Sequence, residues 1–171
     1  MRELNETGTH CGARSITEIV DRPNVVIPPP IAWGLAIVAG LGLGWLYLLR
    51  FVPTSIPRTW VGGGLLALGF ALAIWAMVTI RKAGTQFDIN KPTTTIVENG
   101  PYRLTRNPIY LGMFLGQTGI AIGFDNLWVL AMLVPFYLVI RHGVVAREEA
   151  YLERKFRAVY LAYKSRVRRW L

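Results

Sequence analysis

The sequence Gly100-Pro101-Tyr102-Arg103-Leu104-Thr105-Arg106-Asn107-Pro108-Ile109-Tyr110-Leu111-Gly112 stands at the start of a long apolar run. Asn107 followed by Pro108 is typical of a helix start, because the asparagine oxygen can accept bonds from free N–H groups and proline suits the first helical position. A plain membrane anchor needs only one or two flanking charges, whereas two arginines, two tyrosines and an asparagine gather here. The stretch therefore predicts a place where polar chemistry meets lipid.

Outward from this stretch, four apolar runs are separated by polar segments. Their predicted limits are about 31–52, 60–80, 108–124 and 127–145, close to the length that crosses a hydrocarbon core. With 53% hydrophobic residues, the chain of 171 residues has too little polar surface for a soluble domain. Pro135 is expected to bend the fourth run. The predicted class is an all-α integral membrane protein with about four transmembrane helices, a cytoplasmic loop and a C-terminal amphipathic helix.

The two ends of the chain differ from the apolar middle. Residues 1–27 form a polar arm without the apolar segment of a signal peptide, and residues 28–171 form the single predicted membrane domain. Within it, residues 146–165 place tyrosine, leucine and phenylalanine at helical spacing between charged residues. This pattern indicates an amphipathic helix on the membrane surface.

The positive charges indicate topology and partners. The net charge of +9 comes from Lys and Arg beside the apolar runs, which favours membrane lipids over nucleic acid as partners. The arm holds 3 of these cations, the 81–105 loop with Arg106 holds 5, the tail from Arg141 holds 9, and the first turn holds 2. The positive-inside rule then places both termini and the loop on the cytoplasmic side, and the predicted membrane is an inner or plasma membrane. One cysteine and two histidines argue against a metal cluster.

Three side chains at the opening stretch point to a ligand. Arg106 lies one residue before the helix N-terminus, where free N–H groups and the helix dipole also favour an anion. A small carboxylate or phosphate is the predicted ligand, and an interfacial arginine that snorkels to lipid phosphates is the alternative. Tyr102 and Tyr110 flank the same point, either as aromatic belt residues or as rings that contact a ligand.

A second charged cluster lies where the fourth run ends. Arg141 and Glu148 are seven residues apart, which predicts that they share one helical face. Glu148 would offer a carboxylate to a ligand held between this helix and the start of the third run. The alternative is a solvated helix end.

Four glycines follow the opening stretch at intervals of 4, 3 and 4 residues: Gly112, Gly116, Gly119 and Gly123. The spacing places them on one face, where another helix can approach closely. Helix packing is the favoured interpretation, and a groove for a ligand or lipid chain is the alternative.

Taken together, the motifs from the middle loop to the tail resemble those of the isoprenylcysteine carboxyl methyltransferase family, to which phospholipid N-methyltransferases are more distantly related. The matching residues are Thr93-Thr94-Thr95-Ile96-Val97, Gly100-Pro101-Tyr102, Arg106 to Gly112, Arg147-Glu148-Glu149, Phe156, Tyr160, Tyr163 and Arg166-Val167. The resemblance covers about half of the chain, from Gly84 to Leu171.

The resemblance implies a membrane enzyme that binds S-adenosylmethionine on its cytoplasmic side and methylates a lipophilic small molecule delivered through the bilayer. It implies cofactor contacts at Thr94, Thr95, Ile96, Val97, Tyr102, Asn107, Pro108, Tyr110 and Glu148. The predicted catalytic residues are Arg106, Arg141 and Glu148. The family often has histidine where this chain has Asn107, so hydrogen bonding is expected there without a titratable ring.

Three functions remain open at this stage. The first is S-adenosylmethionine-dependent methyl transfer to a prenylcysteine-like or isoprenoid carboxylate, or to a lipid amine. The second is a membrane reductase that uses NADPH. The third is a noncatalytic assembly protein whose glycine face binds another helix.

Overall fold

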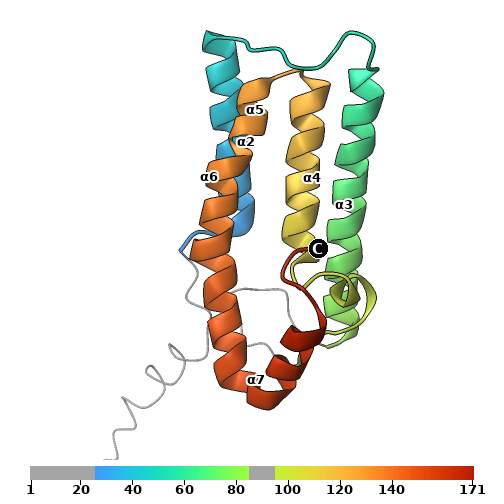
Figure 1. The fold of residues 1–171 in the computed structure, drawn as a ribbon, viewed down its shortest axis with the longest axis vertical. Coiled ribbons are helices and arrows are strands. Elements are labelled where there is room, and N and C mark those ends of the chain that lie inside the picture. The colour runs from blue at the N-terminus through green and yellow to red at the C-terminus, as the bar shows by residue number, and fades with distance from the viewer. Residues whose placement is uncertain (1–25, 85–94) are drawn as a thin grey trace, which may run out of the picture.

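The computed structural model describes residues 26–84 and 95–171, and every regular element in these two ranges is helical. Most of the N-terminal arm and Thr94, which was predicted to contact the cofactor, lie outside the described residues. The elements are α2 (Pro29–Leu46), α3 (Arg58–Lys82), the 3-10 helix η1 (Gly100–Arg103), α4 (Pro108–Gly123), α5 (Leu127–Ala131), α6 (Leu133–Leu138), the π-helix η2 (Val139–Val145) and α7 (Ala146–Arg166). Figure 1 shows the long helices side by side.

Three of the helical stretches are long and apolar enough to cross a membrane. They are α2, α3 and the run from Leu127 to Arg166 that contains α5 to α7. In contrast, α4 has only 16 residues and a length of about 24 Å, less than the hydrocarbon core of about 30 Å. Three of the four predicted spans are therefore supported by length and composition, while the fourth span and the placement of the termini stay predictions.

The first predicted span ends earlier than expected. It was predicted to reach residue 52, whereas α2 ends at Leu46. The backbone N–H groups of Phe51 and Val52 donate to Asp125 Oδ1 at 2.9 and 2.8 Å, and Leu49 O accepts from Leu127 N at 2.9 Å. These bonds hold apolar residues in a nonhelical connection, which hydropathy alone does not reveal.

The glycine face of α4 packs against α3. A Cβ atom added at Gly69 would lie 2.5 Å from Gly112 O, and one at Gly62 would lie 2.6 Å from Gly119 O. Backbone approaches of this kind are possible only where both helices carry glycine. The packing interpretation is therefore correct for Gly112 and Gly119. Because α3 covers this face, the assembly hypothesis loses the free surface it required.

The C-terminal third of the chain is a bent helical run. The helix breaks at Met132, one turn before Pro135, because proline has no N–H to donate to the preceding turn. This agrees with the predicted bend. Further on, Arg157 has a φ of 42° and a ψ of −117° inside α7, a conformation that non-glycine residues rarely adopt. The kink directs the end of α7 back toward the start of α4 (Figure 1).

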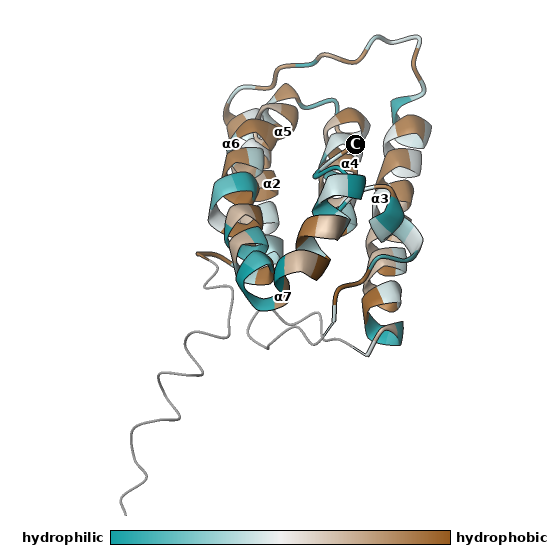
Figure 2. Cartoon of the chain, turned by 60° about the horizontal axis from the view of Figure 1, so that its bottom comes forward, coloured by the Kyte–Doolittle hydropathy of each residue, from teal (hydrophilic) through white to brown (hydrophobic). Residues whose placement is uncertain are grey.

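The C-terminal helix has the expected length but a more buried position than a purely surface-lying helix. It was predicted over 146–165 and spans Ala146–Arg166, yet its residues Tyr151, Tyr160 and Tyr163 are buried. Figure 2 shows hydrophilic colouring concentrated on α7, whereas hydrophobic colouring extends along α2, α3 and α6. The polar end of the bundle is thus built around the beginning of α4.

Candidate active site at the start of α4

Local backbone geometry sets up the approach to α4. Gly100 has a φ of 59°, the left-handed region that glycine adopts without a steric penalty. A Cβ atom there would also lie 3.0 Å from Thr79 Oγ1 of α3. The turn places Tyr102 in a buried cluster with Ala76 and Ile109. Pro108 then occupies the first turn of α4, as predicted from the sequence.

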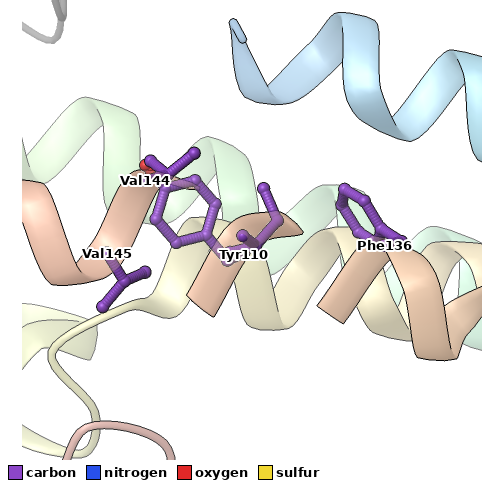
Figure 3. Close-up of a cluster of buried hydrophobic side chains, with 5 residues drawn as sticks. Tyr110, Phe136, Val144 and Val145 are labelled. Atoms are coloured by element: carbon purple, nitrogen blue, oxygen red, sulfur yellow. The ribbon is translucent and has the colours of Figure 1, made fainter. Parts of the chain in front are cut away.

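Tyr110 and Glu148 meet at the centre of this end of the bundle. The Tyr110 hydroxyl donates to Glu148 Oε1 at 2.9 Å, across 38 residues of sequence. The Tyr110 ring is 6% exposed and belongs to an apolar cluster with Phe136, Val144 and Val145 (Figure 3). The expected pairing of these two elements is therefore present, and their roles toward a cofactor stay predictions.

The Glu148 carboxyl is poised to change charge near neutral pH. Burial raises its pKa to about 7, the hydrogen bond from Tyr110 opposes the shift, and the charge of Glu149 adds to it. Among the described residues, Tyr110 is the only hydrogen-bond partner of this side chain. Burial also raises the pKa of Tyr102, with additional contributions from Tyr163 and then Glu148, so Tyr102 lies within electrostatic reach of the carboxyl. The second Glu148 oxygen has no hydrogen-bond partner in the described part of the chain.

The adjacent Glu149 has a different environment, because two arginines hold it. Arg106 NH1 lies 2.9 Å from Glu149 Oε1, and each of these side chains is 9% exposed. Arg169 adds a forked interaction with Nε at 3.0 Å from Oε1 and NH2 at 2.6 Å from Oε2. The Arg106 NH1 group also donates to the Tyr160 hydroxyl at 3.3 Å. The Glu149 carboxylate thus takes the place beside Arg106 where the sequence predicted a small anionic ligand, and the catalytic role predicted for Arg106 stays a prediction.

Asn107 does not cap α4 in the way that the sequence predicts. Its side chain makes no capping bond, and Asn107 Nδ2 instead donates to Arg169 O at 2.9 Å. Thr105 Oγ1 donates to the same carbonyl at 3.0 Å and accepts from Asn107 N at 3.2 Å. The capping prediction is wrong because a carbonyl from the far end of the chain takes the amide.

Residues 166–171, here called the C-terminal strap, cross over the start of α4. Arg106 N donates to Arg168 O at 3.0 Å, and Arg166 pairs with Glu98 at 2.7 Å. The Trp170 ring packs at centroid distances of 5.6 Å from Phe114 and 5.7 Å from Tyr137. Tyr163, just before the strap, donates its hydroxyl to Tyr102 O at 2.8 Å. The strap thus connects the start of α4 with α6, and Tyr163 adds the bond to η1.

Sequence reasoning assigned no role to Glu149, Tyr160 or Arg169, although all three belong to this network. The acidic pair at 148 and 149 and the basic tail were visible as charge patterns. No pattern indicated which acid would face which arginine, because the kink at Arg157 decides that pairing.

Arg141 lies away from the site. Its side chain is exposed, donates to the Tyr137 hydroxyl at 3.1 Å and lies 5.9 Å from the Tyr137 ring centroid. The shared face predicted for Arg141 and Glu148 does not follow from their spacing, because Arg141 lies inside η2 and a π-helix takes up more residues per turn than an α-helix. A separation of seven residues therefore no longer corresponds to two turns of an α-helix here.

The remaining predicted cofactor residues border the same region. Thr95, Ile96 and Val97 are partly buried, and Val97 packs against the cluster of Tyr102 and Ile109. In the described part of the chain, no group of three His, Cys, Asp or Glu side chains is placed to hold a metal ion.

The sequence matches a known protein family over the region that contains this site. Residues 57–159 match the model of the phospholipid methyltransferase family. This match includes α3, α4, the opening stretch and Glu148. It does not include the C-terminal strap.

Three curated relatives are also similar to this chain. The cobalt-zinc-cadmium resistance protein CzcN of Cupriavidus metallidurans is 28% identical over 120 residues, 66% of this chain and 55% of that protein. The nickel-cobalt-cadmium resistance protein NccN of Alcaligenes xylosoxydans xylosoxydans is 27% identical over 99 residues, 57% of this chain and 46% of that protein. An uncharacterized protein of Haemophilus influenzae is 40% identical over 63 residues, 37% of this chain and all of that protein.

The chain spans about half the length of the two resistance proteins that it matches. No solved structure gives a significant match.

Proposed function

Because the chain belongs to the phospholipid methyltransferase family, we propose that it transfers a methyl group from S-adenosylmethionine to a lipophilic acceptor in the membrane. The observation that supports this proposal most directly is the contact of Tyr110 with Glu148 at 2.9 Å. S-adenosylmethionine supplies a methyl group on a positively charged sulfur. A carboxylate with one unoccupied oxygen and the buried tyrosines Tyr102 and Tyr110 are groups that favour such a cation.

In this proposal, the residues of the site position the reactants and keep water away. Tyr110 holds one oxygen of Glu148, so that the other oxygen is oriented toward the ligand. Arg106 and Arg169 hold Glu149, which fixes the first turns of α7 against the start of α4. Such positioning is the main requirement of methyl transfer, because the methyl group is already activated. The role of Arg106 is then indirect.

The acceptor is a carboxylate of a prenylcysteine-like or isoprenoid acid, or a lipid amine. A carboxylate attacks without losing a proton, whereas an ammonium group must first lose one. Glu148, with a pKa of about 7, is a suitable proton acceptor for an amine. The histidine in the described residues, His142, is exposed. The site therefore serves either acceptor class.

The binding step is tested by calorimetry on the purified full chain in lipid nanodiscs. We expect saturable S-adenosylmethionine binding that Glu148→Gln weakens by roughly tenfold to a hundredfold, the usual effect of losing a charged hydrogen-bond partner. Tyr110→Phe should weaken binding less, because the ring remains. A wild-type protein that stays folded and shows no heat of binding would overturn the proposal.

The transfer step is tested with labelled S-adenosylmethionine and a total lipid extract. The methylated product, identified by mass, assigns the acceptor to the acid or the amine class. NADPH titrated into the same sample addresses the reductase alternative. Saturable NADPH binding together with no methylated product would favour the reductase.

A further inference from the structure

A second polar region lies at the opposite end of α4 from Tyr110 and Glu148. Asp125 follows the C-terminal end of α4, whereas Tyr110 is in its first turn, which separates the two by about 22 Å of helical rise. Beside Asp125 is a hollow of about 580 Å³, lined mainly by the connection between α2 and α3. This hollow contains none of the residues of the candidate active site.

The hollow is lined by two arginines, Arg50 and Arg58, and by one carboxylate, Asp125, so its lining has a net positive charge. Asp125 already accepts two backbone N–H bonds through Oδ1, and its Oδ2 pairs with Arg58 NH1 at 3.1 Å. Arg50 also lines the hollow, and its charge helps to lower the pKa of Asp125. Among the described residues, however, its side chain has no hydrogen-bond or ion-pair partner. A guanidinium offers several donors in a planar fork, which suits the oxygens of a phosphate group.

The surroundings indicate where such a phosphate would come from. The hollow lies on the connection between α2 and α3, which are two of the candidate membrane spans. It therefore lies at a membrane surface, whichever side that surface faces. Trp60 lines it and is 83% exposed, and Trp45 at the end of α2 is 87% exposed. Exposed tryptophans of this kind mark the level of lipid headgroups.

We propose that this hollow binds the phosphate of a phospholipid headgroup, with Arg50 and the free nitrogens of Arg58 as its ligands. The exposed Trp60 and Ile56 border the path of the acyl chains. The lipid held here is distinct from a methyl acceptor, because the length of α4 separates it from Glu148. The site belongs to this end of the bundle and does not depend on the proposed methyl transfer.

The proposal is tested by native mass spectrometry of the detergent-purified full chain with added phosphatidylglycerol or phosphatidylcholine. Arg50→Gln should lower the fraction of lipid-bound protein about fivefold for both lipids, the effect of one arginine at a membrane surface. Arg50→Lys should keep most of the binding because it keeps the charge. Arg81→Gln, an exposed arginine at the other end of α3, is the matched control and should leave binding unchanged.

Three results would overturn the proposal. The first is equal lipid retention by the wild type and Arg50→Gln. The second is a loss of lipid binding in Arg81→Gln as large as that in Arg50→Gln. The third is release of the lipid by millimolar inorganic phosphate that itself binds, which would assign the hollow to a free anion. Thermal unfolding of Arg50→Gln provides the folding check. Because Arg50 makes no hydrogen bond or ion pair with the described residues and acts on Asp125 only through its charge, we expect at most a small change of the midpoint.

Discussion

A buried or partly buried carboxyl group lies near each end of α4, Asp125 just after its last residue and Glu148 of α7 beside its first turn, and the two groups have opposite environments. Asp125 receives two backbone donors and one arginine, and the N–H groups of Val52 and Phe51 hold its pKa below the usual value. Glu148 has one tyrosine partner, and burial raises its pKa to about 7. Asp125, with three donors, fixes the connection between α2 and α3. Glu148, with one donor among the described residues, could still accept a bond from a ligand.

Glu149 shows that the two arrangements can be adjacent in sequence. It follows Glu148 directly, yet it resembles Asp125 because both of its oxygens are held by arginine side chains. The distinction between a structural and a functional carboxyl therefore depends on the number of donors around each group. Four predictions test this distinction, beginning with the largest effect.

The largest loss of stability is expected from Glu149→Ala. This change leaves Arg106, which is 9% exposed in its side chain, buried without its carboxylate. Removing one partner of a buried ion pair costs about 3 to 5 kcal/mol of the free energy of unfolding. Thermal unfolding followed by circular dichroism in detergent measures it. A change as small as that of Arg154→Ala, an exposed arginine on the same helix, would contradict the structural role of Glu149.

The charge of Glu148 predicts a pH dependence of cofactor affinity. A cationic ligand favours the ionised carboxylate, so affinity should rise about tenfold from about pH 6 to about pH 8, as the carboxyl titrates with a pKa of about 7. The stability contribution has the opposite sign, because the raised pKa favours the protonated folded protein and this contribution is lost as pH rises toward 7. Calorimetry across this range should show a flat profile for Glu148→Gln. A flat wild-type profile would place the cation away from Glu148.

Asp125→Asn should affect stability without affecting cofactor affinity. The amide keeps one acceptor oxygen but loses the charge that Arg58 and the two N–H groups face, so the melting temperature falls. The lowered pKa of Asp125 adds that wild-type stability declines in acid as this carboxylate becomes protonated. Cofactor affinity measured in parallel should match the wild type. A loss of affinity would mean that the two ends of α4 are coupled.

The smallest effect distinguishes two views of Asn107. If its oxygen capped α4, Asn107→Asp would be neutral or stabilising, because aspartate is an equally good cap. In the structure its amide donates to Arg169 O, so Asn107→Asp should destabilise the protein by about 1 kcal/mol or more by placing an oxygen against a carbonyl. Thermal unfolding at neutral pH measures the difference. Asn107→Ala is the reference variant, because it removes both the oxygen that could cap α4 and the amide that donates to Arg169 O.

The sequence alone predicted much of this architecture from local rules. Helices α3 and α4 follow from their apolar runs, from Pro108 at the first position and from the glycine spacing that matches α3. The proximity of Tyr110 and Glu148 was expected because the family resemblance implies that both border one cofactor site, but their direct hydrogen bond was not predicted. The helical features depend on periodicity and hydropathy, which neighbouring residues determine.

Other features depended on the tertiary structure. The π-helical turn of η2 removes Arg141 from the face of Glu148, and the Asp125 bonds end α2 at Leu46. The kink at Arg157 returns the strap to α4, where Arg169 O takes the amide of Asn107.

The sequence by itself thus determined which segments are largely helical and that Tyr110 and Glu148 lie at the polar end of the bundle. Only the tertiary structure decided that Glu149 is neutralised by Arg106 and Arg169, whereas Glu148 has a single hydrogen-bond partner, Tyr110, among the described residues. The physical reason is that the two acids are identical in local sequence character, and the donors that distinguish them come from segments tens of residues away.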